Sequence, residues 1–208
     1  MPTNTLKAGF SAFLLPDRRE YQTLTRVLDA NLSGDPQFEI RRFTEQPGNE
    51  GNTNPSRHEP SLCLLRRGSL RIPPQMPHQV LDVNLGEFLD ALETYSPDLM
   101  QISTLGFARA VVVNSRKRYG EAYFTLLPDD RSRTILEDKA NRIMQALRVV
   151  TGNHRLDVGR RHLDMTVAYA KPGTPPEQLS AALPPLKDLL PLSLEFGPAV
   201  YYPDPRQC

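Results

Sequence analysis

Polar side chains alternate along one short run in the second half of the chain. His162, Asp164 and Thr166 are spaced two apart, with leucine and methionine between them. In a β-strand, residues i and i+2 point to the same face, so this run predicts a face that carries an imidazole, a carboxylate and a hydroxyl. A histidine can transfer protons at neutral pH, and a hydroxyl beside it can hold a substrate oxygen. The run is therefore a candidate for acid–base chemistry.

A second candidate run, His58-Glu59-Pro60-Ser61, lies in the first half of the chain. Ser61 has Glu59 two positions before it, whereas His58 is three positions before it and has the wrong parity for a regular strand. Pro60 can bulge the start of the strand and turn His58 to the other face. Two interpretations stay open: either His58 and His162 reach a shared site from displaced positions, or the site has lost its histidines and only binds.

Arginines flank both runs and are candidates for binding phosphate by bidentate pairing. Arg66 follows the first run, and Arg155 and Arg161 precede the second. A solvated surface charge is the other interpretation of any single arginine. Tyr201 can offer its ring to a nucleobase for stacking, and core packing is the alternative role for this ring.

The elements that must position these runs occur twice. The tetrapeptide Leu-Leu-Pro-Asp ends a β-like run at residues 14–17 and again at 126–129, which is 112 positions later. In both places proline ends the strand, and the aspartate is placed to cap a helix with an apolar stripe. Each half then continues as strand, helix and strand. We therefore predict an α+β fold in one domain, 1–208, with lobes of about 8–114 and 119–203.

The connections differ between the two halves. Residues 45–57 are dense in glycine, proline and asparagine and have no periodicity, which predicts a mobile loop. The other expected elements are strands at 61–65, 108–113, 163–169 and 197–202 and helices at 85–92 and 177–183.

This duplicated order of elements, with Leu-Leu-Pro-Asp in each half, resembles the two-histidine (2H) phosphoesterase superfamily, which includes 2′-5′ RNA ligase-like proteins and cyclic nucleotide phosphodiesterases. The resemblance implies a duplicated two-lobe fold of two facing antiparallel sheets with helices outside and a central cleft. It also implies one His-x-Thr/Ser motif on an inner strand of each lobe, with one histidine as general base and the other as general acid. The catalytic residues that it implies are His58, Ser61, His162 and Thr166.

The resemblance implies metal-independent hydrolysis of a cyclic or 2′-5′ phosphodiester of RNA or a nucleotide, without a cofactor. The candidates for substrate binding are Arg66, Arg155, Arg161, Asp164 and Tyr201. The chain departs from the family pattern because acids, Glu59 and Asp164, stand at the two histidine positions. The alternative is therefore a catalytically inactive, diverged member that binds a nucleotide, an RNA end or a protein partner.

Composition excludes several other classes. The 208 residues are 39% hydrophobic and 24% charged, and their formal net charge of +1 gives no overall attraction to nucleic acid or a membrane. No apolar run approaches the roughly 18–20 residues of a membrane span. The N-terminal residues lack the apolar stretch of a secretory signal, so we expect an intracellular, cytoplasmic or nuclear protein. Two cysteines cannot form a disulfide framework or a four-ligand zinc site, and the scattered histidines predict no metal site.

Overall fold

The structure is a computed structural model that describes residues 5–6, 10–32, 38–43, 60–65, 70–71, 85–114, 122–154, 156–158, 163–171 and 173–203. The elements of the first half are β1 (Thr5–Leu6), β2 (Phe10–Leu14), α1 (Arg18–Leu32), β3 (Phe38–Ile40), β4 (Leu62–Leu65), β5 (Leu70–Arg71), α2 (Leu85–Tyr95), the 3₁₀ turn η1 (Pro97–Met100) and β6 (Ser103–Asn114). Those of the second half are β7 (Ala122–Pro128), α3 (Asp130–Thr151), β8 (Asp157–Val158), β9 (Met165–Ala170), α4 (Pro176–Lys187), β10 (Leu192–Phe196) and β11 (Val200–Pro203). Within these described ranges, every helix is too short or too polar to cross a membrane.

An antiparallel sheet runs through most of the described chain. Its strand order is β10-β6-β7-β9-β4-β2-β11, with β3 paired to β9, and β1, β5 and β8 form a smaller sheet. Strands β4 and β9 meet at one residue pair, Leu62 with Met165, and this junction divides the large sheet into two halves. The predicted α+β fold with antiparallel strands is confirmed. The two predicted sheets are joined edge to edge at this junction.

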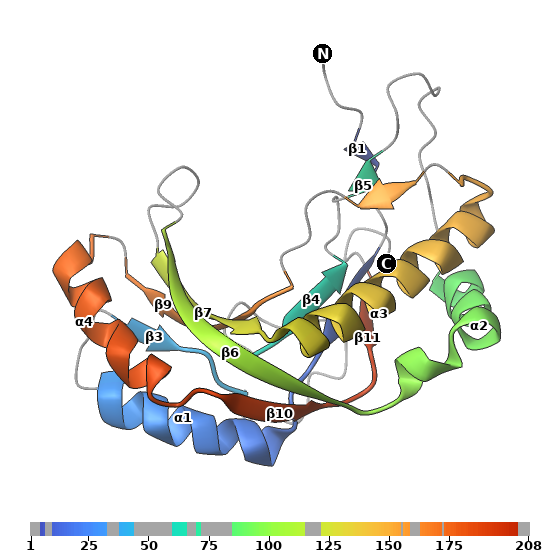
Figure 1. Cartoon of the computed structure of the whole chain (residues 1–208). Coiled ribbons are helices and arrows are strands. Elements are labelled where there is room, and N and C mark those ends of the chain that lie inside the picture. The colour runs from blue at the N-terminus through green and yellow to red at the C-terminus, as the bar shows by residue number, and fades with distance from the viewer. Residues whose placement is uncertain are drawn as a thin grey trace.

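The large sheet curls until its two ends meet (Figure 1). The chain that leaves β2 pairs with β10, because the Asp17 N–H donates to the Glu195 carbonyl at 2.6 Å and the Gly197 N–H donates to the Leu15 carbonyl at 3.0 Å. Strands β10 and β11 are the two ends of the sheet order, yet only residues 197–199 separate them in the chain. The two halves of the sheet therefore face each other.

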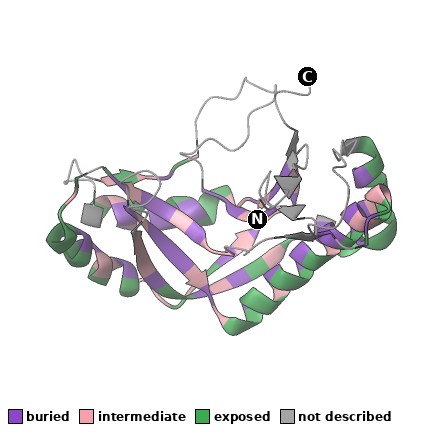
Figure 2. Ribbon diagram, turned by 90° about the horizontal axis from the view of Figure 1, so that it is seen from above, coloured by how far each residue is buried: buried purple, intermediate pink, exposed green. Residues whose placement is uncertain are grey.

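Helices cover the outer face of each half. Helices α1 and α4 pack against the half that contains β3, β6 and β10 (Figure 1). Helix α3 packs against β4 of the other half and also against β6 and β7, and α2 packs against α3. Strand residues under the helices are buried, while the solvent side of each helix is exposed (Figure 2). Along β7, Phe124 and Leu126 are buried under the helices, and Tyr123 and Leu127 on the other side are half-buried. Thr125 shares that other side but is buried as well. The side of the sheet that faces away from the helices is called the inner face below.

Aspartates cap the two long helices, as the repeated tetrapeptide predicts. At the start of α1, Oδ1 of Asp17 accepts hydrogen bonds from the backbone of the first turn, including the Glu20 N–H at 3.0 Å. At the start of α3, Oδ1 of Asp129 accepts from the Ser132 N–H at 2.7 Å. Each carboxylate thus satisfies backbone donors that have no partner inside the helix.

The third residue after each aspartate ties its helix to a neighbouring strand. Glu20 accepts a hydrogen bond from the Glu195 N–H at 2.5 Å, and Oγ of Ser132 accepts from the Gly106 N–H at 2.7 Å. A Cβ at Gly106 would lie 2.2 Å from Oδ2 of Asp129, so any other residue there would displace the capping carboxylate. The two halves of the chain therefore use matching contacts to fix their first helix on the sheet.

The cap at Asp129 predicts a pH-dependent contribution to stability. Hydrogen bonds from the backbone and side chain of Ser132 hold the pKa of the Asp129 carboxyl below its ordinary value of 3.8. A lower pKa in the folded state means that the carboxylate stabilises the fold above about pH 4, and that this contribution is lost as the pH falls through the folded-state pKa. Asp129→Asn keeps a cap acceptor but removes the charge. Its Tm deficit relative to the natural sequence should shrink as the pH falls below about 4.

The matched control for this experiment is Asp130→Asn, because Asp130 is the next residue and is exposed in the first turn of α3. Thermal unfolding of the three proteins, measured by circular dichroism from about pH 7 to about pH 2.5, tests the prediction. A Tm deficit of Asp129→Asn that stays constant over this range would contradict it.

Candidate functional site

The two predicted hydroxyl residues lie on neighbouring segments of the sheet. Leu62 pairs with Met165 in antiparallel register, and both side chains are fully buried under the helices. Extending this register by one residue places Ser61 opposite Thr166, and both then point to the inner face. Ser61 is buried and Thr166 is half-buried. Two segments that are far apart in the chain thus bring their hydroxyl groups to one place.

Asp164 lies beside these hydroxyls and is held by the neighbouring strand. Thr125 of β7 pairs with Thr166 and is therefore on the inner face. Its hydroxyl donates to Oδ2 of Asp164 at 2.8 Å. Because Thr125 is only 1% exposed, this charge-assisted bond is shielded from water and fixes the carboxylate against the sheet. A fixed carboxylate therefore lies on the inner face beside Thr125.

A β-bulge in β9 sets which side chains follow Thr166 on the inner face. Phe124 pairs with Ala168 and Thr125 pairs with Thr166, so Val167 is the extra residue. Val167 and Ala168 are both fully buried, so the usual alternation shifts by one residue here. The shift places Tyr169, the next residue, on the inner face.

A cation and two aromatic rings extend the inner face beyond Thr166. The backbone N–H of Arg41 donates to the Val167 carbonyl at 2.9 Å, and its guanidinium carbon lies 5.5 Å from the ring centroid of Tyr169. The ring centroids of Tyr169 and of Tyr123, which is on the paired strand, lie 6.2 Å apart. Arg41 is 8% exposed, so the fold buries a permanent positive charge at this place.

Sequence reasoning missed Arg41, Tyr169 and Tyr123. Arg41 follows β3, which has three residues and is too short to show a periodic pattern. The only local signal is a charged residue directly after an apolar–polar–apolar run, and this signal does not reveal that β3 pairs with β9. To predict that the rings of Tyr169 and Tyr123 meet on the inner face, one would have had to know of the bulge.

Tyr201, the remaining predicted site residue that the structure describes, does not join this cluster. Tyr201 pairs with buried Ala12 and packs edge-on against Phe88 of α2, with ring centroids 5.4 Å apart, so it lies on the outer face. Burial raises the pKa of its hydroxyl. The predicted loop 45–57 lies outside the described residues. So do five of the predicted site residues: His58, His162, Arg66, Arg155 and Arg161.

The arrangement on the inner face suits an anionic, oxygen-rich ligand. The Ser61 and Thr166 hydroxyls can donate hydrogen bonds, and Arg41 supplies positive charge on the same face. The carboxylate of Asp164 can accept a hydrogen bond from a ligand hydroxyl. In the part of the chain that the structure describes, no three His, Cys, Asp or Glu side chains come together as metal ligands.

The fold and the inner face define an α+β protein whose curled antiparallel sheet has two facing halves. Two solved structures are similar to it over nearly the whole chain. Usb1 of Kluyveromyces marxianus superposes with a TM-score of 0.46 at 11% sequence identity, covering 94% of this chain and 98% of that one. The structure of the same protein with uridine monophosphate gives a TM-score of 0.46 at 11% identity, covering 93% and 97%. No protein-family model and no curated protein sequence matches the chain.

Proposed function

We propose that this chain is a 2H phosphoesterase-like protein, built of two repeated lobes in one domain, that binds a phosphodiester of RNA or a nucleotide on the inner face and hydrolyses it without a metal ion. The observation that carries this proposal is the register of β4 and β9, which places Ser61 opposite Thr166. The matching helix caps at Asp17 and Asp129 support the repeat, because two copies of one unit would begin alike.

In the proposed reaction, water opens a 2′,3′-cyclic phosphate. One of His58 and His162 takes a proton from the water while the new P–O bond forms at phosphorus. The other histidine gives its proton to the ribose oxygen while the old P–O bond breaks, so protons and charge balance. The hydroxyls of Ser61 and Thr166 donate to the two non-bridging oxygens, which gain charge in the transition state.

The negative charge of the Asp164 carboxylate must be offset by a nearby positive charge for a phosphate to bind. Two negative groups at hydrogen-bond distance repel each other, and this repulsion is stronger at a site shielded from water. Arg41 supplies a compensating charge on the same face. Arg66, Arg155 and Arg161 remain the predicted additional phosphate ligands, and Asp164 then accepts a hydrogen bond from a ribose hydroxyl.

The purified protein should convert a 2′,3′-cyclic nucleotide into a nucleoside monophosphate in excess EDTA. Each of the four cyclic nucleotides and a 2′-5′ oligoadenylate is incubated with the protein, and products are separated by chromatography. Thr166→Val keeps the side-chain shape but removes the hydroxyl, so turnover should fall by about 10²-fold. The matched control is Thr104→Val, at an exposed position of β6. Turnover that appears only after a divalent ion is added would argue against the proposal.

Binding without catalysis is a second candidate function. The hydrogen bond from Thr125 to Asp164 favours it, because it holds a carboxylate where the resemblance implies a catalytic histidine. Titration calorimetry with the same cyclic nucleotides separates the two functions. A saturable heat of binding with no product after prolonged incubation would identify a binding protein.

A further inference from the structure

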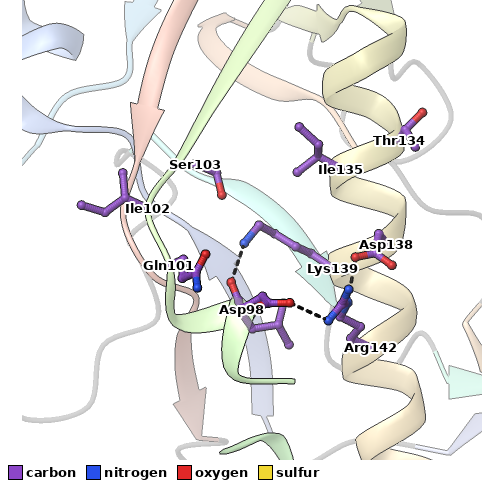
Figure 3. Close-up of a pocket in the computed structure, with 10 residues that line it drawn as sticks. Asp98, Gln101, Ile102, Ser103, Thr134, Ile135, Asp138, Lys139 and Arg142 are labelled. Atoms are coloured by element: carbon purple, nitrogen blue, oxygen red, sulfur yellow. Dashed lines mark hydrogen bonds and ion pairs between the residues drawn. The ribbon is translucent and has the colours of Figure 1, made fainter. Parts of the chain in front are cut away.

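A pocket of about 390 Å³ lies between α3 and the segment that leads from η1 into β6 (Figure 3). It shares no residue with the inner-face cluster. Leu99, Ile102 and Ile135 give it apolar walls, and Gln101, Ser103 and Thr134 supply polar groups. Its charged residues are Asp98, Asp138, Lys139 and Arg142.

Lys139 brings a buried ammonium group to this pocket. The residue is 7% exposed, and Nζ donates to the backbone carbonyl of Asp98 at 3.3 Å. Among the residues that the structure describes, no carboxylate lies within 4.0 Å of this nitrogen. An ammonium carries three donors, and one long bond to a neutral carbonyl leaves most of its hydrogen-bonding capacity unused. Buried charges in proteins are normally paired with an opposite charge.

The two carboxylates of the pocket are engaged by another residue. Asp98 accepts from Nη1 of Arg142 at 3.0 Å, and Asp138 accepts from Nε of Arg142 at 2.7 Å. Their side chains are 60% and 57% exposed, so water screens their charge. Figure 3 shows Arg142 bonded to both carboxylates, while Lys139 reaches the main chain of Asp98. This pairing leaves Lys139 as the cation that lacks a direct counter-charge.

We propose that this pocket binds a small organic anion, a carboxylate or phosphate monoester with a short apolar body, through the ammonium of Lys139. The hydroxyl of Ser103 and the amide of Gln101 supply further donors for the anionic group. Ile102 and Ile135 contact the apolar body, and Ile102 is otherwise 62% exposed. The volume falls within the range of about 300–1,000 Å³ that small-molecule sites occupy.

Binding of such an anion is coupled to pH. Burial, with Arg142 nearby, lowers the pKa of Lys139 in the free protein, while Asp98 and Asp138 partly oppose this effect. A bound anion favours the charged ammonium and so raises the same pKa. The protein therefore takes up protons as the anion binds, and affinity falls as the pH rises through the lowered pKa of Lys139.

The test is a titration of the ¹⁵N-labelled full chain with sodium butyrate and, separately, with inorganic phosphate, followed by NMR. We expect saturable amide shifts at Ser103, Thr134 and Lys139, and weaker binding at higher pH. Lys139→Met removes the charge and should weaken binding at least about tenfold, or about 1.4 kcal/mol. Lys187→Met, at an exposed position of α4, is the matched control and should leave it unchanged.

The two probes also distinguish the ligand classes. Saturation by butyrate alone identifies a carboxylate ligand, saturation by phosphate alone identifies a phosphate monoester, and saturation by both shows that charge dominates recognition. The absence of saturable shifts at the pocket with either probe overturns the proposal. So does an affinity that Lys139→Met leaves unchanged. If Lys139→Met does not fold, the titration map of the natural protein decides between these outcomes, and Lys139→Arg, which keeps the charge, should retain phosphate binding.

Discussion

Replacing His162 with alanine is expected to lower kcat/KM for a 2′,3′-cyclic nucleotide by about 10²–10⁴-fold, which is the usual contribution of a general acid or base. His162 is four positions before Thr166 and two before Asp164, so a regular strand would carry all three on one face. In the proposed reaction the imidazole of His162 transfers the proton, while Thr125 holds the carboxylate of Asp164. The measurement is steady-state hydrolysis in EDTA.

His154→Ala is the matched control for this change, because His154 is a histidine that is exposed in the turn after α3. Its kcat/KM should equal that of the natural protein. A pH–rate profile adds a second readout, since loss of the histidine should remove the limb of the profile that it controls. Unchanged kcat/KM in His162→Ala would falsify the role assigned to this residue.

Leu62→Ala is expected to lower the free energy of unfolding by about 2–5 kcal/mol. Leu62 is fully buried, and it makes the residue pair with Met165 that joins the two halves of the sheet. Removing its side chain leaves a cavity between β4, β9 and the covering helix, and the surrounding strands close it only partly. The same change should weaken substrate binding, because the register at this pair sets Ser61 opposite Thr166.

Cys63→Ala is the matched control, because Cys63 is the next residue of β4, lies on the inner face and is half-buried. We expect it to cost less than about 1 kcal/mol, since little apolar area is lost. Urea unfolding of both variants, followed by circular dichroism, gives the comparison. Equal losses in the two variants would show that the burial difference between the two faces of β4 is unimportant.

The elements that the sequence predicts well are those with local signals. The caps at Asp17 and Asp129 and the helices after them follow from side-chain bonds within one turn and from an apolar stripe, so no distant contact is needed. The helix expected at 85–92 is found as α2 and continues to Tyr95. The strand expected at 108–113 is the later part of β6, which begins at Ser103.

Strands with distant partners were harder to predict. Strand β10 was not expected, because Leu192–Phe196 is short and only its pairing with β6 identifies it as a strand. Strand β3 was missed for the same reason. The joining of the two predicted sheets depends on the single pair between β4 and β9, which no local pattern encodes.

The candidate site shows the same division. Strand parity placed Asp164 and Thr166 on one face, and the register with β4 adds Ser61 to that face. The contact from Thr125 could not be anticipated, because β7 and β9 come together only in the folded sheet. For Tyr201 the sequence allowed either face, and the pairing of β11 with β2 places the ring against Phe88.

Strands β10 and β11 are neighbours in the chain but belong to different halves of the sheet, and this constrains how the protein folds during its synthesis. These two strands are separated by residues 197–199, yet β10 completes one half of the sheet beside β6 and β11 completes the other half beside β2. A ribosome makes residues 192–203 after every other strand of the large sheet, so β6 and β2 each keep an unpaired edge until this segment emerges. Both halves of the sheet must therefore close together, around one short stretch that is made after all their other strands.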